Sequence, residues 1–316
     1  MKNPGIAICV AVTVLAAAAP GFSQSESEQG QGRAVVTVLP KQERALPPSV
    51  TVQDLSVKVD GKPARVTSWK PFQSPENSLE LVLLIDGSAG NGLGSQFDSI
   101  KSFVNSLPPN TKAAIAYMQN GSALFSGPLS ADHAEVLRAL HLPAGSAGTS
   151  ASPYFCLSDL AKHWPSTDSQ ARREVVMVTD GIDLYHPELD NGDPYLQAAI
   201  ADSVRARLVV YSIYWQGKGN AGSSSYENNA GQSLLAMVSE ATGGKNFGTG
   251  LSNPVSFQPF FDELTRRFRN QYELGFVSSL NGKPQVESMK LKLSAPGTEV
   301  DSPRQVMVYP AATAQK

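Results

Sequence analysis

Carboxylate and hydroxyl side chains stand beyond several apolar, strand-like runs of the chain. Asp86 and Ser88 follow the run LELVLLI, and Asp180 ends the run EVVMVTD. Thr149 lies in the loop AGSAGTSASP, ahead of a predicted helix. Because functional groups gather beyond the carboxyl ends of strands in an open parallel sheet, we expect these four residues to lie close together. Oxygen ligands from separate loops suit a hard divalent cation, so the pattern indicates a Mg²⁺ site.

The elements that would position these residues alternate between strand and helix. Strands are predicted at 79–85, 112–118, 122–128, 174–180, 207–215 and 245–249, and helices at 95–107, 131–140, 152–163, 194–206, 229–244 and 256–271. This alternation predicts the α/β fold class, with a doubly wound, mostly parallel sheet and helices on both of its faces.

Strand patterns flank this region on both sides. Before it, the runs 34–40 and 55–69 are strand-like, and after it the runs 271–278, 287–297 and 304–310 are strand-like. Because chain termini usually lie close together, we expect the two flanking segments to associate as a small accessory β-sheet. The predicted parts are an N-terminal β segment at 34–78, an α/β domain at 79–270 and a C-terminal β segment at 271–316.

The first residues have the pattern of a secretory signal peptide. Lys2 precedes an apolar run at 6–19, and small residues follow it, so we predict a signal peptide at 1–23 and a flexible linker at 24–33. The alternative is a retained membrane anchor, for which the apolar run is short. After cleavage the chain would keep one cysteine, Cys156, and no transmembrane segment. We expect an exported protein, either periplasmic or extracellular.

The three loops resemble the motifs of the von Willebrand factor type A family. Asp86-Gly87-Ser88 resembles the start of that family's Asp-x-Ser-x-Ser signature, AGTSASPYFCLSDL its threonine loop, and VVMVTDGID its TDG strand end. The flanks are similar to those of exported bacterial relatives of the domain. The resemblance covers about residues 79–270 and implies a type A-like sheet of Rossmann-like topology.

The resemblance also implies a metal-ion-dependent adhesion site. Asp86 would anchor the cation, and Ser88 and Thr149 would coordinate it through their hydroxyls. Asp180 would either coordinate the cation directly or orient its other ligands. An open coordination position would then accept a carboxylate from a protein partner. The signature's second serine is replaced by Gly90, so the implied site is degenerate. The alternative is a metal-independent scaffold or interaction protein of the cell envelope on the same fold.

Composition and motifs argue against other classes of function. The formal net charge is −2, and no cluster of lysines and arginines is strong enough for nucleic acid. The glycines after Asp86 lack the Gly-x-Gly-x-x-Gly order, and the Asp86 carboxylate would repel a pyrophosphate. Ser88 lacks the Gly-x-Ser-x-Gly elbow of a hydrolase, and no histidine has an evident partner. We therefore expect no enzymatic activity and no catalytic residue.

Two further loops stand at the same predicted edge. DGIDLYHPELDNGDP, which contains Asp183 and Asp193, is interpreted as a solvated acidic loop rather than a Ca²⁺ site. GKGNAGSSSYENNAG is either a mobile connector or a recognition loop with Tyr226 as an aromatic contact. Taken together, the sequence predicts an exported, non-enzymatic binding or adhesion module whose strand-end face engages a protein partner. It does not identify the partner or the oligomeric state.

Overall fold

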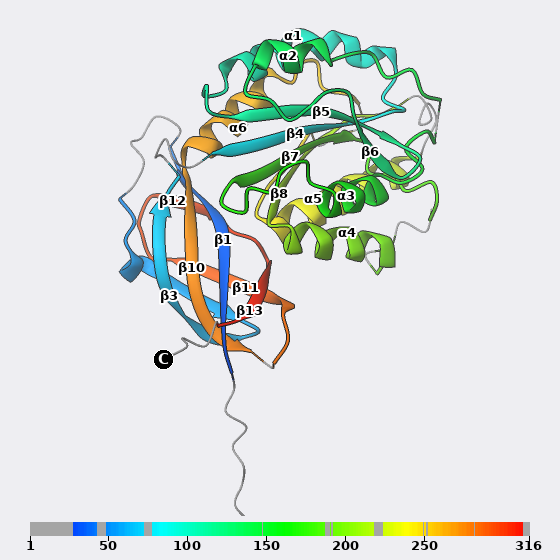
Figure 1. The fold of residues 1–316 in the computed structure, drawn as a ribbon. Coiled ribbons are helices and arrows are strands. Elements are labelled where there is room, and N and C mark those ends of the chain that lie inside the picture. Colours follow the sequence, from blue (N-terminus) through cyan, green and yellow to red (C-terminus); the bar gives the residue numbers. More distant parts are fainter. Residues whose placement is uncertain are drawn as a thin grey trace, which may run out of the picture.

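The computed structural model describes residues 28–42, 49–72, 78–146, 148–186, 190, 192–217, 224–248, 250, 252–280 and 282–311. The chain forms two parts that lie side by side, an α/β layer structure and a β-barrel (Figure 1). The predicted signal peptide at 1–23 lies outside the described residues. Within the described part of the chain, no helix is long and apolar enough to span a membrane.

The α/β part is built on a six-stranded mixed sheet. Its strands, in spatial order, are β6 (Ser122–Phe125), β5 (Lys112–Gln119), β4 (Leu79–Asp86), β7 (Arg172–Thr179), β8 (Leu208–Tyr214) and β9 (Asn246–Phe247). Neighbouring strands are parallel except β6, which runs antiparallel to β5. All eight residues of β4 are buried, including Glu80 and Asp86, because the strand lies in the middle of a sheet that is covered on both faces.

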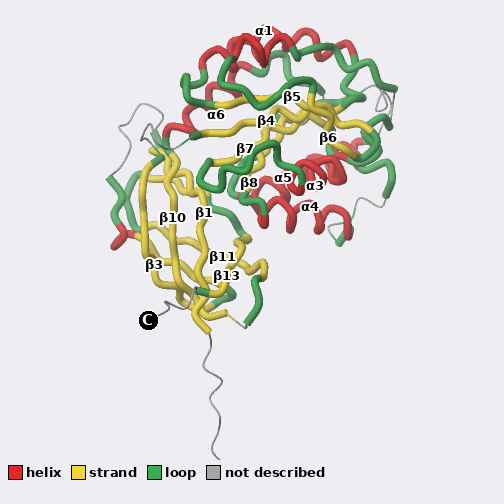
Figure 2. The backbone as a smooth tube through the Cα atoms, viewed as in Figure 1, coloured by secondary structure: helices red, strands yellow, loops and turns green. Residues whose placement is uncertain are grey.

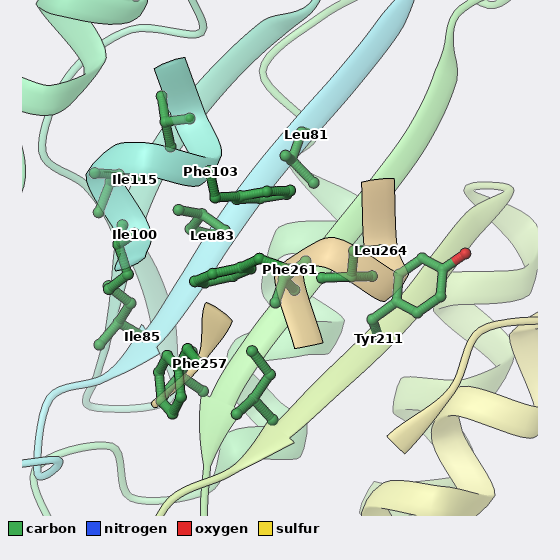
Figure 3. Close-up of a cluster of buried hydrophobic side chains, with 14 of the residues drawn as sticks. Leu81, Leu83, Ile85, Ile100, Phe103, Ile115, Tyr211, Phe257, Phe261 and Leu264 are labelled. Atoms are coloured by element: carbon green, nitrogen blue, oxygen red, sulfur yellow. The ribbon is translucent and has the colours of Figure 1, made fainter. Parts of the chain in front are cut away.

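Helices cover both faces of this sheet. One face carries η2 (Asn91–Gln96), α1 (Phe97–Ser106), α2 (His133–Arg138) and α6 (Gln258–Arg269), and the other carries α3 (Pro153–Lys162), α4 (Pro194–Arg205) and α5 (Ser225–Thr242) (Figure 1). Because successive strand residues face opposite sides, Leu83 packs toward α1 and α6 while Leu84 packs toward α3, α4 and α5. On the face covered by α1 and α6, the rings of Phe103 and Phe261 stack with 4.4 Å between their centroids (Figure 3).

The flanking segments form an antiparallel barrel. Its elements are β1 (Glu28–Pro40), η1 (Val52–Asp54), β2 (Leu55–Val59), β3 (Lys62–Pro71), β10 (Gln271–Leu280), β11 (Gln285–Leu293), β12 (Thr298–Asp301) and β13 (Gln305–Pro310). The strand order is β10-β3-β2-β11-β13-β1, and β1 pairs again with β10 to close six strands, while β12 adds to β1. In Figure 2 this part is almost entirely strand. A separate apolar core fills it, with Val36, Leu274 and Phe276 fully buried.

The predicted fold class is therefore wrong. We expected one doubly wound, mostly parallel sheet with a small accessory sheet, and the chain instead combines a mixed sheet with a closed six-stranded barrel that has its own core. The strand patterns at the two ends of the sequence did not show which strands pair. Closure depends on the ten-residue antiparallel pairing of β1 with β10, and these two strands lie far apart in the sequence.

The predicted linker at 24–33 is also wrong where the structure describes it, because residues 28–33 are the first part of β1. This stretch is polar and rich in glycine, which is why its composition suggested flexibility. Gly30 and Gly32 face the barrel interior, where a Cβ atom would collide with Leu280 and Phe276 respectively. Glycine is thus required here by the close approach of core side chains.

Candidate functional site

The loops that carry the predicted site residues meet at the carboxyl ends of β4 and β7. The Gly145 amide donates a 3.2 Å hydrogen bond to the Gly87 carbonyl, which joins the loop before α3 to the loop after β4. A Cβ atom at Gly87 would lie 3.0 Å from Cγ2 of Thr149, so the two loops are in direct contact. The expected gathering of the loops at one edge of the sheet is therefore present.

The carboxylate of Asp86 is buried and held by protein donors. Its Oδ1 accepts hydrogen bonds from the Ser88 amide at 2.9 Å and the Ser88 hydroxyl at 2.7 Å. Its Oδ2 accepts one from the Thr179 hydroxyl at 2.7 Å. Thr179 was not predicted as a site residue, although its position directly before Asp180, at the end of a strand beside β4, places it within reach of Asp86.

Thr149 and Asp180 make local hydrogen bonds of their own. The Thr149 hydroxyl donates to the Ser146 carbonyl at 2.7 Å within the same loop. The Asp180 carboxylate is buried, and its Oδ1 accepts from the Ile182 amide at 2.9 Å. Asp86 and Ser88 thus form a tight pair, while Thr149 packs beside that pair with its hydroxyl directed at the Ser146 carbonyl.

The backbone at Gly90 differs from what the serine of a complete signature needs. Gly90 has φ 76° and ψ 177°, a region that is essentially restricted to glycine. The loop after β4 therefore follows a path that a serine at this position would not take without strain. The signature's second hydroxyl is missing, and the backbone conformation is also unsuited to it.

In this arrangement the hydrogen bonds of Asp86 count against a resident divalent cation. Mg²⁺ prefers about six oxygen ligands in octahedral geometry, and the Asp86 carboxylate already accepts three internal hydrogen bonds. Among the described residues, no group of three or more histidine, cysteine, aspartate or glutamate side chains could hold a metal ion. The assignment of Asp86, Ser88, Thr149 and Asp180 as metal ligands stays a prediction, and the hydrogen bonds favour the metal-independent alternative.

The loop after β7 is only partly the solvated acidic loop that we expected: Asp190 is exposed, but two other described acidic residues are not. Asp183 and Asp193 are buried, and Asp183 accepts a 2.6 Å hydrogen bond from the Ser152 hydroxyl. The Tyr154 hydroxyl donates to the Gly181 carbonyl at 2.7 Å, and burial, followed by the nearby Asp180, Asp183 and Asp193, raises the pKa of Tyr154 well above its ordinary value. These buried contacts fix the backbone of the loop beside the Asp86 pair.

Large apolar side chains stand exposed on the loops and the helix end that follow the carboxyl ends of the strands, or lie next to them. The exposed fractions are 43% for Leu142, 53% for Leu184, 64% for Tyr185, 70% for Tyr226 and 98% for Val255. We call these five residues the apolar rim.

Their contacts place several rim residues next to the site loops. A Cβ atom at Gly148 would lie 3.4 Å from Leu184, and one at Gly94 would lie 3.0 Å from Leu142. Tyr185 packs edge-on against Phe155, with 5.2 Å between ring centroids. Sequence reasoning considered Tyr226 and missed the other four, because exposure of an apolar residue in a loop leaves no pattern in the sequence.

The chain is similar in structure to several proteins of known structure. Neither a protein-family model nor a curated protein matches the chain. The similar structures include an aerotolerance-related membrane protein from Bacteroides fragilis (14% identity, TM-score 0.42), over 60% of this chain and 98% of that chain. They also include the pilus adhesin SpaC from Lactobacillus rhamnosus GG (9% identity, TM-score 0.45), over 87% of this chain and 49% of that chain.

A third similar structure is the manganese-loaded TRAP protein of Plasmodium vivax (14% identity, TM-score 0.37), over 76% of this chain and 97% of that chain. The VWA domain of SpRpn10 is among the similar structures as well (14% identity, TM-score 0.31), over 48% of this chain and 82% of that chain. At these identities and TM-scores the comparisons concern the fold alone, and the chain's function has to be argued from its own residues.

Proposed function

We propose that the strand-end face of the α/β part is a non-enzymatic protein-binding surface. The observation that carries this proposal is the apolar rim, five large side chains exposed by between 43% and 98% around a buried polar centre. Exposed apolar groups next to polar ones are typical of protein interaction sites, and tyrosine is enriched among residues that dominate binding energy.

In this proposal, the buried hydrogen bonds around Asp86 and Asp183 fix the loops that carry part of the apolar rim. The hydrogen bonds from Ser88 and Thr179 to Asp86, and from Ser152 to Asp183, hold the loops that present Leu184 and Tyr185. A surface fixed before binding loses less conformational entropy when the partner docks. The binding face therefore needs no cation to be ordered, and we propose the metal-independent form of the function.

Two other features support this reading. The Ser88 hydroxyl donates to Asp86, a geometry that orients Asp86 and does not activate Ser88 as a nucleophile through a histidine. The signal-peptide pattern at 1–23 supports an exported protein, periplasmic or extracellular, whose partner would be another protein of the cell envelope or its surroundings.

Site-specific photo-crosslinking in the native cell tests the proposal. A photoreactive amino acid is placed at Tyr185 or at Tyr226, and as a control at Lys62, an exposed residue of β3 in the barrel. We expect the same partner protein to be captured from the two rim positions and not from Lys62. Capture from all three positions, or from none, contradicts a binding face at the strand ends.

Variants then measure the contribution of the rim with the purified partner. Leu184→Asp combined with Tyr185→Ser should weaken binding at least tenfold, since desolvated aromatic contacts contribute on the order of 2 kcal/mol each. Val52→Ser, at an apolar residue of the barrel that is 45% exposed, is the matched control and should leave affinity unchanged. Replacing Mg²⁺ by EDTA should not alter binding, and a loss in EDTA would favour the metal-dependent form.

A further inference from the structure

A cleft of about 670 Å³ lies where the barrel meets the α/β part. It is lined by residues of β1, β3, β10 and β13 from the barrel, and by residues of β7, α4 and the segments next to them from the α/β part. Arg173 is the second residue of β7 and Arg207 directly precedes β8. The cleft thus lies at the amino ends of these strands, whereas Asp86 and Thr179 stand at carboxyl ends.

Positive charge from both parts converges on this cleft. Its charged lining residues are Arg33, Lys70, Arg173, Arg205 and Arg207, against the single carboxylate of Glu273. Three of these cations have a carboxylate nearby: Arg33 lies 3.8 Å from Glu273, Arg173 lies 3.9 Å from Glu80, and Arg205 lies 2.9 Å from Asp202. Lys70 and Arg207 are therefore the cations of the lining that are left without an ion pair among the described residues. A concave surface lined by one sign of charge concentrates ligands of the opposite sign.

Arg207 and Lys70 enter no ion pair within the described part of the chain. The guanidinium of Arg207 is held by the carbonyl of Ser169, which orients it but carries no net charge. Arg173 lies beside it and donates to the carbonyls of Ser166 at 3.0 Å and Asp168 at 3.2 Å. Burial is the main cause that lowers the pKa of Arg173. The carboxylate of Glu80 opposes this shift, and the charge of Arg207 adds to it, which places the two guanidinium groups near each other.

The backbone of Arg207 adds an independent observation. Arg207 has φ 57°, the left-handed conformation, and it follows Ala206, the residue that ends α4. Glycine or asparagine is the usual residue at this position after a helix, because a Cβ atom there costs free energy. An arginine kept in a strained position, with its guanidinium in a cleft, is the kind of outlier that points toward function.

The cleft also carries apolar groups among its charges. Met307 and Tyr309 of β13 line it, and Tyr309 is 42% exposed. A long polyanion such as a nucleic acid needs an extended basic track along which its phosphates can run. Here the cations and an exposed aromatic ring line one cleft, which suits a short acidic peptide that has carboxylates and apolar side chains.

We propose that this interdomain cleft binds an acidic peptide segment of a partner protein. Arg207 would donate bidentate hydrogen bonds to a carboxylate, Lys70 would add a point charge from the barrel side, and Tyr309 would contact an apolar side chain. The site is separate from the apolar rim, and it bridges the two parts of the chain, so an occupant contacts both at once.

Fluorescence anisotropy with defined peptides tests the proposal on the full chain. The probe is a labelled peptide of alternating glutamate and leucine, and its control has glutamine in place of glutamate. We expect the glutamate peptide to bind, its affinity to fall as salt rises, and the glutamine peptide to bind at least tenfold more weakly. Arg207→Gly and Lys70→Gln should each weaken the glutamate peptide roughly three- to tenfold.

The Arg207→Gly variant separates binding from folding. Glycine relaxes the left-handed backbone at this position, so the melting temperature should stay equal or rise while binding weakens. Lys62→Gln, on the same strand as Lys70 but outside the cleft lining, is the matched control and should bind as wild type.

Three results would overturn the proposal. One is equal binding of the glutamate and glutamine peptides, and another is unchanged affinity in both cleft variants. The third is binding of a heparin oligosaccharide or a single-stranded oligonucleotide, sensitive to Arg207→Gly, without binding of the glutamate peptide. None of these results bears on crosslinking at the apolar rim, so the two proposals fail independently.

Discussion

Gly90 occupies a backbone conformation that a serine side chain opposes. Its φ of 76° and ψ of 177° belong to a region where any Cβ atom is strained by about 1–3 kcal/mol. A comparison of motif letters alone suggests that one hydroxyl is missing from an otherwise complete site. The backbone indicates instead that the loop after β4 has adapted to glycine, and that Asp86 has taken Thr179 and Ser88 as its partners.

We therefore predict that Gly90→Ser destabilises the protein and does not create a metal site. The unfolding free energy should fall by about 1–3 kcal/mol, because the added Cβ atom is disfavoured at this φ and ψ. Urea unfolding of wild type, Gly90→Ser and the matched Gly90→Ala, each in Mg²⁺ and in EDTA, is the measurement. Both variants should lose similar stability in both solutions. Recovery by Mg²⁺ in Gly90→Ser alone would show that position 90 is a decayed metal ligand.

At the scale of the elements, β1 shows how close packing can override composition. Its first residues are polar or glycine, yet the strand pairs with β10 over ten residues and with β13 over three. Gly32 stands against the Phe276 ring, and the neighbouring Gln31 faces outward and is exposed. A flexible composition becomes a strand here because the barrel interior leaves no room for side chains at alternate positions.

Gly32→Ala should accordingly destabilise the barrel. The new methyl group would collide with Phe276, and overpacking of a filled core typically costs about 1–3 kcal/mol. Gln31→Ala, one residue away on the outer face, is the control and should change stability by less than about 0.5 kcal/mol. Thermal unfolding followed by circular dichroism measures both, and equal stability of the two variants would contradict the packing argument.

The sequence predicted elements better than it predicted their association. The helix predicted at 152–163 is α3, and the hydroxyl of the first predicted residue, Ser152, accepts from the Tyr154 and Phe155 amides as an N-cap. The apolar run that became β4 was equally clear. Barrel closure was not predictable, because it depends on pairing between Glu28 and Leu280 and their neighbours, residues about 250 positions apart, which no local pattern reports.

The candidate site was predictable to the same degree. The motifs located Asp86, Ser88, Thr149 and Asp180 at one edge of the sheet. They did not report that Thr179 would hold Asp86, since a threonine inside a strand is an ordinary strand residue in sequence. Likewise, burial of Asp183 depends on Ser152 from another loop, and only the folded chain brings these two side chains together.

At the scale of the whole molecule, a buried charge joins the two parts. Arg267 of α6 is buried and forms an ion pair with Asp301 of β12 at 2.7 Å. Breaking a buried ion pair leaves an uncompensated charge, so this contact penalises separation of the barrel from the α/β part. Glu174 of β7 is fully buried, with one oxygen 3.2 Å from the guanidinium of Arg172 in the same strand. Gln271 of β10 and the charge of Arg267 also act on the Glu174 carboxyl, which places it at the junction.

Glu174 makes this junction sensitive to pH. Burial raises the pKa of its carboxyl from 4.5 to about 7, against the opposing attraction of Arg172. An acid whose pKa is higher in the folded state binds more protons when folded than when unfolded. Its contribution to stability is therefore greatest below pH 4.5, declines as pH rises through about 7, and stays constant above that value.

Glu174→Gln should remove this pH dependence, because glutamine keeps the size of the side chain but does not ionise. The difference between 4.5 and about 7 corresponds to an upper limit of roughly 3 kcal/mol. Unfolding free energies of wild type and variant are measured by urea titration at several pH values from about 5 to 8. The variant should gain stability relative to wild type as pH rises from 5 to about 7, with little further change above 7, since only wild type must ionise a buried carboxyl. A free-energy difference that stays constant across this range would mean that Glu174 does not titrate at the junction, and that the Arg172–Glu174 pair remains charged throughout.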